Sequence, residues 1–150
     1  MFAKYVDRHF PTAHEVLLVA DGNLVTAREL YNRYSLTVID PDIRSKHKTR
    51  RYSKIIGKPF FAQMKINCDV IIGMHPDEAT GEIIDYAIAN KKPCAVVPCC
   101  MKGKYSETCK GKQRWVKHLK NILIQKGFSV EIHMLPIHGD NQVILARPRA

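Results

Sequence analysis

The segment from 69 to 101 constrains the fold of this chain more than any other part of the sequence. An apolar run at 70–72 ends in the polar turn 73–78, and a stretch with helical periodicity follows. A second apolar run, 94–97, then ends in Pro98-Cys99-Cys100. In an open parallel sheet the polar ends of both strands lie at the same carboxyl edge, where ligands bind. The sequence therefore predicts chemistry at this edge, from side chains in the two polar turns.

The rest of the chain continues the alternation of strands and helices. Periodicity and turn signals predict helices at 1–10, 24–34 and 112–126, and strands at 16–20, 35–40, within 53–64, at 128–135 and at 142–147. Such alternation is typical of a mostly parallel α/β sheet with helices on both faces. The last two strands flank a turn signal and predict a hairpin, which would add one antiparallel strand at the edge of the sheet.

Length and composition favour one ordinary globular domain, 1–150. The chain has no long apolar run and its first residues lack the apolar core of a secretory signal, so we expect no membrane partner. The five cysteines are odd in number, and Cys94 lies inside an apolar strand, which argues against a disulfide framework. We expect a reducing, cytoplasmic compartment.

The net charge of +10 comes largely from two basic segments, 44–58 and 102–120. Clustered cations favour polyanions, and RNA is the partner that we expect, although a merely solvated surface would have the same composition. Tyr52 and Tyr105 stand among these cations and are candidates to stack on bases. Trp115 instead fits the apolar face of its predicted helix and is expected in the core.

The first strand–helix–strand unit contains a candidate cofactor site. Its turn reads Asp21-Gly22-Asn23, and Asp40 follows about twenty residues later, where a carboxylate can accept hydrogen bonds from both hydroxyls of a ribose. With a single glycine the turn lacks the G-x-G-x-x-G fingerprint, which disfavours a dinucleotide. A nucleoside cofactor without phosphates demands less of the turn. Alternatively, Asp21 and Asp40 only cap a helix and a turn.

Together these features resemble the compact class I S-adenosylmethionine-dependent methyltransferases, over essentially the whole chain. The resemblance implies a Rossmann-like three-layer sandwich whose seven-stranded, mostly parallel sheet ends in an antiparallel hairpin. The pairing of a turn containing His75, followed by Ala79-Thr80, with a turn containing Cys99-Cys100 is similar to a branch that includes tRNA 2′-O-methylating enzymes and uncharacterised methyltransferase-like proteins.

The resemblance also assigns roles to individual residues. It implies that S-adenosylmethionine is the cofactor, bound by the first turn, by Asp40 at the ribose and by His75. The residues assigned to the cofactor are Asp21, Gly22, Asn23, Asp40 and His75. The turn that contains His75, Pro76 and Asp77 would face the methyl acceptor. The nucleoside would then lie across the carboxyl ends of the first, second and fourth strands.

Methyl transfer is an in-line displacement that depends mainly on alignment, and a hydroxyl acceptor benefits from a base. His75, with an ordinary pKa near 6.5, is the candidate base, and Asp77 could orient it. These two are the predicted catalytic residues. The predicted acceptor pocket comprises Pro76, Glu78, Pro98, Cys99 and Cys100. Alternatively, His75 only bonds to backbone, and Asp77 and Glu78 begin the next helix, where acids complement its dipole.

The adjacent cysteines allow other interpretations. We favour these less than the interpretation that both residues line the acceptor pocket. On a strand the two side chains would point to opposite faces. Zinc would require an irregular set such as Cys99, Cys100, Cys109 and His118, without C-x-x-C spacing, so we expect no metal. A nucleophilic thiol near Lys102 is the remaining reading.

The predicted function is that of an S-adenosylmethionine-dependent methyltransferase acting on RNA. A non-catalytic RNA-binding or assembly module that retains the fold is the first alternative, and a small-molecule methyltransferase is the second. No separate substrate-recognition domain is visible, so a homodimer or a partner chain could supply one.

Overall fold

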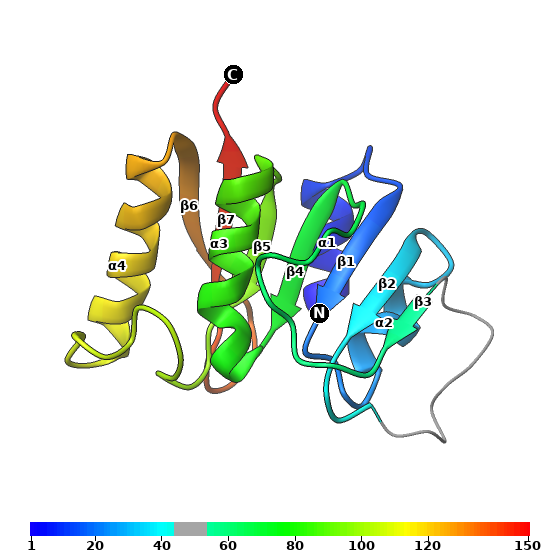
Figure 1. Cartoon of the computed structure of the whole chain (residues 1–150), viewed down its shortest axis with the longest axis horizontal. Coiled ribbons are helices and arrows are strands. Elements are labelled where there is room, and N and C mark those ends of the chain that lie inside the picture. The colour runs from blue at the N-terminus through cyan, green and yellow to red at the C-terminus, as the bar shows by residue number, and fades with distance from the viewer. Residues whose placement is uncertain (44–53) are drawn as a thin grey trace.

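The structure, a computed structural model, describes residues 1–43 and 54–150. Its centre is one seven-stranded sheet with the order β3-β2-β1-β4-β5-β7-β6 (Figure 1). The strands are β1 (Glu15–Val19), β2 (Ser35–Ile39), β3 (Lys54–Ile56), β4 (Val70–Met74), β5 (Cys94–Val97), β6 (Phe128–Met134) and β7 (Gln142–Pro148). Neighbours among β1 to β5 pair in parallel, whereas β7 is antiparallel to both β5 and β6. The predicted fold class is confirmed.

Helices cover both faces of the sheet and complete three layers (Figure 1). They are α1 (Phe2–His9), α2 (Val25–Leu30), α3 (Thr80–Asn90), which the short 3-10 turn η2 (Asp77–Ala79) precedes, and α4 (Lys112–Gln125). Alternate residues of β1 separate the two cores: Val16 and Leu18 pack with α1 and α2, whereas Leu17 and Val19 pack with α3 and α4. This alternation follows from the period of two along a strand. Trp115 is fully buried in the second core, as predicted.

Two sequence predictions about the elements are corrected. The helix predicted at 24–34 spans Val25–Leu30. It begins one residue later than predicted because Leu24 adopts a left-handed φ of 55°. The antiparallel strand predicted at the edge, β7, lies one position inward, since it pairs with β5 on one side and β6 on the other. Most of the basic segment 44–58, with Tyr52, lies outside the described residues.

Two further findings concern membrane-spanning helices and the state of the cysteines. In the described ranges no helix is both long and apolar enough to cross a lipid bilayer. All five cysteines are free thiols.

Candidate functional site

A cavity of about 640 Å³ opens at the carboxyl edge of the sheet. It crosses the ends of β1, β2 and β4, the three strands predicted to hold a nucleoside. The described residues that line it are Ala20, Asp40, Pro41, Asp42, Pro59, Phe60, Phe61, Pro76, Asp77, Glu78, Ala79, Glu82, Lys102, Gly103 and Lys104. Its volume lies within the range of about 300–1,000 Å³ typical of small-molecule sites.

Asp40 follows β2 and forms part of the cavity wall while remaining only 8% exposed. Its Oδ1 accepts the Asp42 N–H at 2.7 Å, and the Gly22 N–H is a second backbone donor. Gly22 lies close to this carboxylate, because an added Cβ would come within 3.3 Å of Asp40 Oδ1, a tight contact. Burial raises the pKa of Asp40 more than these hydrogen bonds lower it. A poorly solvated carboxylate of this kind favours hydroxyl donors from a ligand.

Asp21 has a structural role in the first turn. Its Oδ2 accepts the Ala27 N–H at 2.9 Å and its Oδ1 accepts the Thr26 N–H at 3.4 Å, so that the side chain closes the first turn of α2. Burial raises the pKa of Asp21 as well. Of the first turn, only Gly22 approaches the cavity, through its contact with Asp40.

The turn after β4 is conformationally strained. His75 and Asp77 both adopt left-handed φ values, 53° and 48°, which are costly for residues with a Cβ. The Nε2 of His75 lies 2.8 Å from the carbonyl oxygen of Asp140. Because a carbonyl only accepts, this Nε2 carries the proton and Nδ1 is the basic atom. Burial, and then the charge of Lys112, lower the pKa of His75, so the imidazole is neutral at pH 7.

The turns after β4 and β5 meet, as their position at one edge predicts. The Cys99 thiol donates to Asp77 Oδ1 at 3.0 Å, and the Cys100 thiol is also hydrogen-bonded to Asp77. The expectation that the two cysteines diverge is wrong, because β5 ends at Val97 and the alternation of a strand does not extend to them. Burial and the Asp77 carboxylate raise the pKa of Cys99 to about 11.

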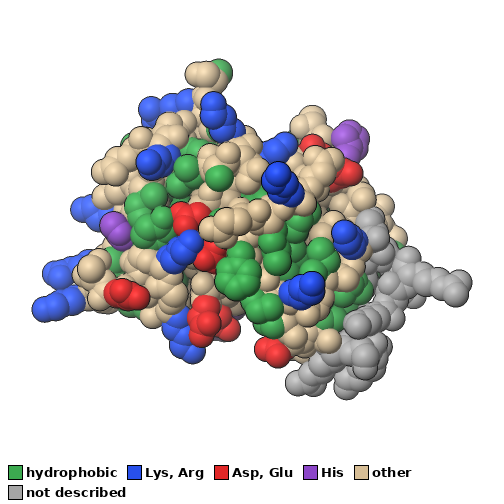
Figure 2. All heavy atoms as spheres, viewed as in Figure 1, with side chains coloured by type: hydrophobic (Ala, Val, Ile, Leu, Met, Phe, Trp, Pro, Cys, Tyr) green, Lys and Arg blue, Asp and Glu red, His purple; other side chains and the backbone are tan. Residues whose placement is uncertain are grey.

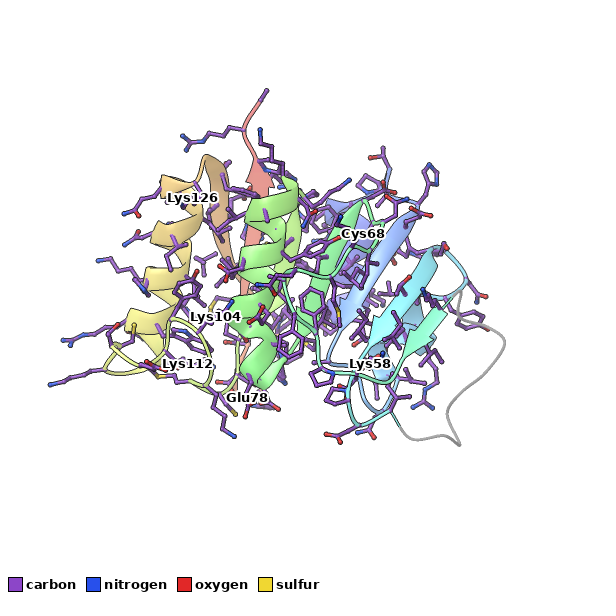
Figure 3. All side chains as sticks on the ribbon, in the orientation of Figure 1. Lys58, Cys68, Glu78, Lys104, Lys112 and Lys126 are labelled. Atoms are coloured by element: carbon purple, nitrogen blue, oxygen red, sulfur yellow. The ribbon has the colours of Figure 1, made fainter. Side chains whose placement is uncertain are left out.

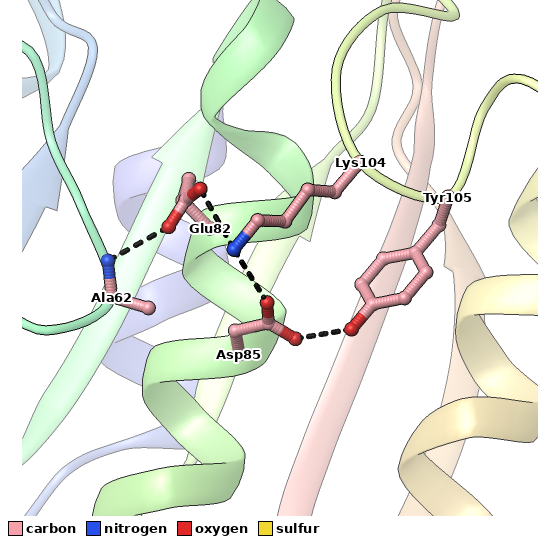
Figure 4. A network of polar contacts seen from close by, with 5 residues as sticks. All are labelled: Ala62, Glu82, Asp85, Lys104 and Tyr105. Carbon is pink, nitrogen blue, oxygen red and sulfur yellow. Dashed lines mark hydrogen bonds and ion pairs between the residues drawn. The ribbon is translucent and has the colours of Figure 1, made fainter.

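A polar network holds one wall of the cavity together (Figure 4). The Lys104 ammonium lies 3.0 Å from both Glu82 Oε1 and Asp85 Oδ2. The Tyr105 hydroxyl donates to Asp85 Oδ1 at 2.5 Å, and Glu82 Oε2 accepts the Ala62 N–H at 2.8 Å. The network joins α3 to the loop before β4 and to the loop after β5.

Two glycines allow this loop to lie directly on α3. A Cβ on Gly81 would come within 2.6 Å of Lys104 Cβ and 2.9 Å of the Lys104 carbonyl oxygen. Gly103 has a φ of 74°, and a Cβ there would meet the Glu78 carbonyl oxygen at 2.6 Å. Both positions therefore require glycine for the cavity wall to close. Figure 3 shows Glu78 toward the same end of the molecule as Lys112, at the start of α4, whereas Lys126 lies at the other end of this helix.

The predicted site residues are divided between the cavity wall and its surroundings. The residues in the wall are Asp40, Pro76, Asp77 and Glu78. Those outside the set of lining residues are Asp21, Gly22, Asn23, His75, Pro98, Cys99 and Cys100. The sequence analysis missed the aromatic pair Phe60 and Phe61, for which adjacent apolar residues in a Pro-containing loop were the only signal, and it missed Glu82.

Tyr105, a candidate for base stacking, donates its hydroxyl to Asp85 and packs edge-on against His118 at 6.1 Å between ring centroids. Its ring is therefore part of the wall's support. Stacking on RNA stays a prediction for this residue.

No family model matches this sequence, and no curated protein sequence matches it significantly. Solved methyltransferase structures are similar in fold. The mitomycin 7-O-methyltransferase MmcR matches with a TM-score of 0.60 and 14% identity, over 98% of this chain and 53% of that one. An S-adenosylmethionine-dependent methyltransferase from Aquifex aeolicus matches at 0.64 and 14%, over 96% and 87%.

Human N-acetylserotonin methyltransferase, solved in complex with S-adenosylmethionine, matches at 0.63 and 16% identity, over 99% of this chain and 52% of that one. This chain thus spans about half the length of MmcR and of the human enzyme. At these identities the likeness establishes a common fold. The chain therefore has the architecture found in S-adenosylmethionine-dependent methyltransferases.

Proposed function

We propose that this protein binds S-adenosylmethionine in the cavity at the carboxyl edge and transfers its methyl group to an acceptor. The observation that carries the proposal is the position of the buried Asp40 carboxylate in a cavity that crosses the ends of β1, β2 and β4. In open α/β sheets this is where nucleoside ligands bind, with an acid at the ribose. The common fold with known methyltransferases supports the same reading.

The charge of the cavity fits a cationic ligand. Five acidic side chains and two lysines line it, although the whole protein carries a net charge of +10. The acids are Asp40, Asp42, Asp77, Glu78 and Glu82. One lysine, Lys104, is already paired with Glu82 and Asp85. An acidic pocket in a basic protein favours a positively charged sulfonium over a nucleotide phosphate.

The proposed roles follow from these positions. Asp40 accepts the ribose hydroxyls, and the Phe60–Phe61 wall offers apolar surface to the base. When bound, the cofactor supplies an electrophilic methyl group. His75, neutral and with Nδ1 free of the proton, can accept a proton from an acceptor that reaches the β4 turn. Asp77 lies in this turn and also lines the cavity.

We further propose that the acceptor is RNA. Exposed cations follow β5 and continue along α4: Lys102, Lys110, Arg114 and Lys117. Figure 2 shows Lys and Arg side chains gathered over the α4 end of the molecule. Such a basic surface beside an acidic pocket separates a polyanion track from the methyl-donor site.

Calorimetric titration with S-adenosylmethionine and with its demethylated product tests the first proposal. We expect saturable heat with the wild-type protein and a strong loss in Asp40→Asn. No heat and no thermal shift with either ligand would contradict the proposal and favour a non-catalytic module.

Filter retention of RNA at several salt concentrations tests the acceptor. A steep decrease of affinity with salt, made shallower in an Arg114→Gln, Lys117→Gln variant, is expected. Cofactor binding without salt-dependent RNA retention would instead favour a small-molecule acceptor.

A further inference from the structure

The contact between the turns after β4 and β5 brings together two thiols and a carboxylate, all of which can bind zinc. One ligand atom from each of Asp77, Cys99 and Cys100 lies within 4.8 Å of the other two. Within 1–43 and 54–150 no other group of three or more His, Cys, Asp or Glu side chains meets this condition. We propose that Asp77, Cys99 and Cys100 bind one zinc ion, a site that goes beyond the proposed methyl transfer and can be tested without it.

The distances suit a tetrahedral ion. Thiolate and carboxylate ligands lie about 2.0–2.3 Å from zinc, which in a tetrahedron places them about 3.3–3.8 Å from one another. Cys99 Sγ and Asp77 Oδ1 are 3.0 Å apart, and all three ligand atoms fall within 4.8 Å. Small side-chain rotations are therefore sufficient. The strained φ of 48° at Asp77 fixes its carboxylate toward the thiols, and such strain is typical of ligand sites.

The hydrogen bonding of the cluster also fits a cation. The Cys99 thiol donates its hydrogen to the Asp77 carboxylate, to which the Cys100 thiol is also hydrogen-bonded. Binding of zinc would release the two thiol protons and leave two thiolates and a carboxylate on the metal. The neighbouring Lys112 ammonium, which interacts electrostatically with both cysteines, is ion-paired with Asp140. Its charge is therefore partly offset.

The ligand types select the metal and its coordination. Paired thiolates favour zinc over magnesium or calcium, which prefer oxygen ligands. Three protein ligands leave the fourth position for water, the arrangement of zinc sites that are not purely structural. Because Asp77 also lines the cavity, the ion would stand at the cavity wall. Asp77 and Cys100 are exposed, so the metal has a path from solvent.

The test is to measure metal in reduced protein purified without chelators. We expect about one equivalent of zinc, and titration of the apo-protein with Co²⁺ should produce a thiolate-to-cobalt charge-transfer band that saturates at one equivalent. Cys99→Ser and Cys100→Ser should each weaken zinc affinity at least about 100-fold, because the loss of an outer-shell partner alone costs about 10–100-fold. Asp77→Asn should weaken it less.

Cys109→Ser is the matched control, since Cys109 bonds the Tyr105 carbonyl oxygen and is not part of the cluster. It should retain the cobalt band and the zinc affinity. The wild-type titration stands by itself if a variant fails to fold. Absence of a saturable charge-transfer band, or equal losses in Cys109→Ser and Cys99→Ser, would overturn the proposal.

Discussion

The two ends of the strands in this sheet use their polar residues differently. At the amino edge, a cavity of about 410 Å³ is bordered by Asp69 and Arg147. Asp69 Oδ2 accepts the N–H groups of His14 and Glu15 at 2.8 and 2.9 Å. Arg147 donates to the His9 carbonyl oxygen at 2.9 Å. At this edge, both of these charged side chains therefore bond to the backbone of the chain itself.

The carboxyl edge instead concentrates strain and poorly solvated acids. Of the six left-handed non-glycine residues in the described ranges, five follow strands or precede α2 at this edge: Ala20, Leu24, His75, Asp77 and Tyr105. The sixth, Lys91, ends α3. Strain of this kind persists where surrounding packing holds it, typically at binding sites. The comparison shows polar groups that are satisfied within the chain at one edge, and backbone strain around the proposed binding cavity at the other.

The largest effect is expected when one carboxylate at each edge is replaced by an amide. Asp40→Asn should reduce affinity for S-adenosylmethionine about 100-fold, because two hydrogen bonds to a charged acceptor contribute about 3 kcal/mol. Asp69→Asn is the matched control and should leave this affinity unchanged. Calorimetry measures both. Equal losses in the two variants would remove the functional distinction between the edges.

Gly81→Ala tests the supported wall of the carboxyl-edge cavity. Alanine favours a helix by about 1 kcal/mol over glycine, yet overpacking against Lys104 costs about 1–3 kcal/mol. We expect a net loss of stability of up to about 2 kcal/mol in chemical denaturation, with weaker cofactor binding. Gly57→Ala, where an added Cβ meets nothing within 4 Å, is the control. A stabilised Gly81→Ala protein would show that the loop is not held against α3.

Asp69→Asn should lower the free energy of unfolding at pH 7 by about 1 kcal/mol, a modest value because the carboxylate is exposed. The N–H groups of Glu15 and His14 lower its pKa below the ordinary value of 3.8. A carboxyl group whose pKa is lower in the folded state stabilises the protein at pH values above its unfolded-state pKa. This stabilisation is lost as the pH falls through the folded-state pKa. The difference in unfolding free energy between variant and wild type should therefore be present at pH 7 and shrink as the pH falls toward about 2. A constant difference would contradict this role.

The smallest expected effect is the pH dependence of cofactor binding. Burial, with Asp42 and Asp77 nearby, raises the pKa of Asp40, so protonation begins above the usual range for a carboxyl group. The protonated form loses acceptor strength for hydroxyls, and binding should weaken as pH falls toward that pKa. Calorimetry at several pH values measures the slope. Asp40→Asn should abolish it, and an unchanged slope in that variant would assign the effect to another group, such as Asp21.

Most of the fold could be predicted because buried parallel strands are continuous apolar runs. The run at 70–72 and the run at 94–97 are such strands, and the turn between 135 and 142 identifies the hairpin. Strand order within the hairpin could not be obtained from local pattern. It depends on whether β6 or β7 pairs with β5, which is a long-range choice.

The candidate site was predicted in part for a similar reason. Spacing alone brings Asp40 to the edge of the sheet, and it lines the cavity there. The thiol–carboxylate contact required knowing that β5 ends before Cys99. The network of Ala62, Glu82 and Lys104 joins residues about twenty positions apart on three segments, and no periodicity connects them.

The inward position of β7 has a consequence during synthesis of the chain. Residues 142–148 follow β6 in sequence but lie between β5 and β6, so a nascent chain that has emerged only through β6 has no partner for the edge of β5. That unpaired edge can capture other strands. The sheet can close only after β7 has been synthesised, and until then the edge of β5 stays open to unwanted pairing.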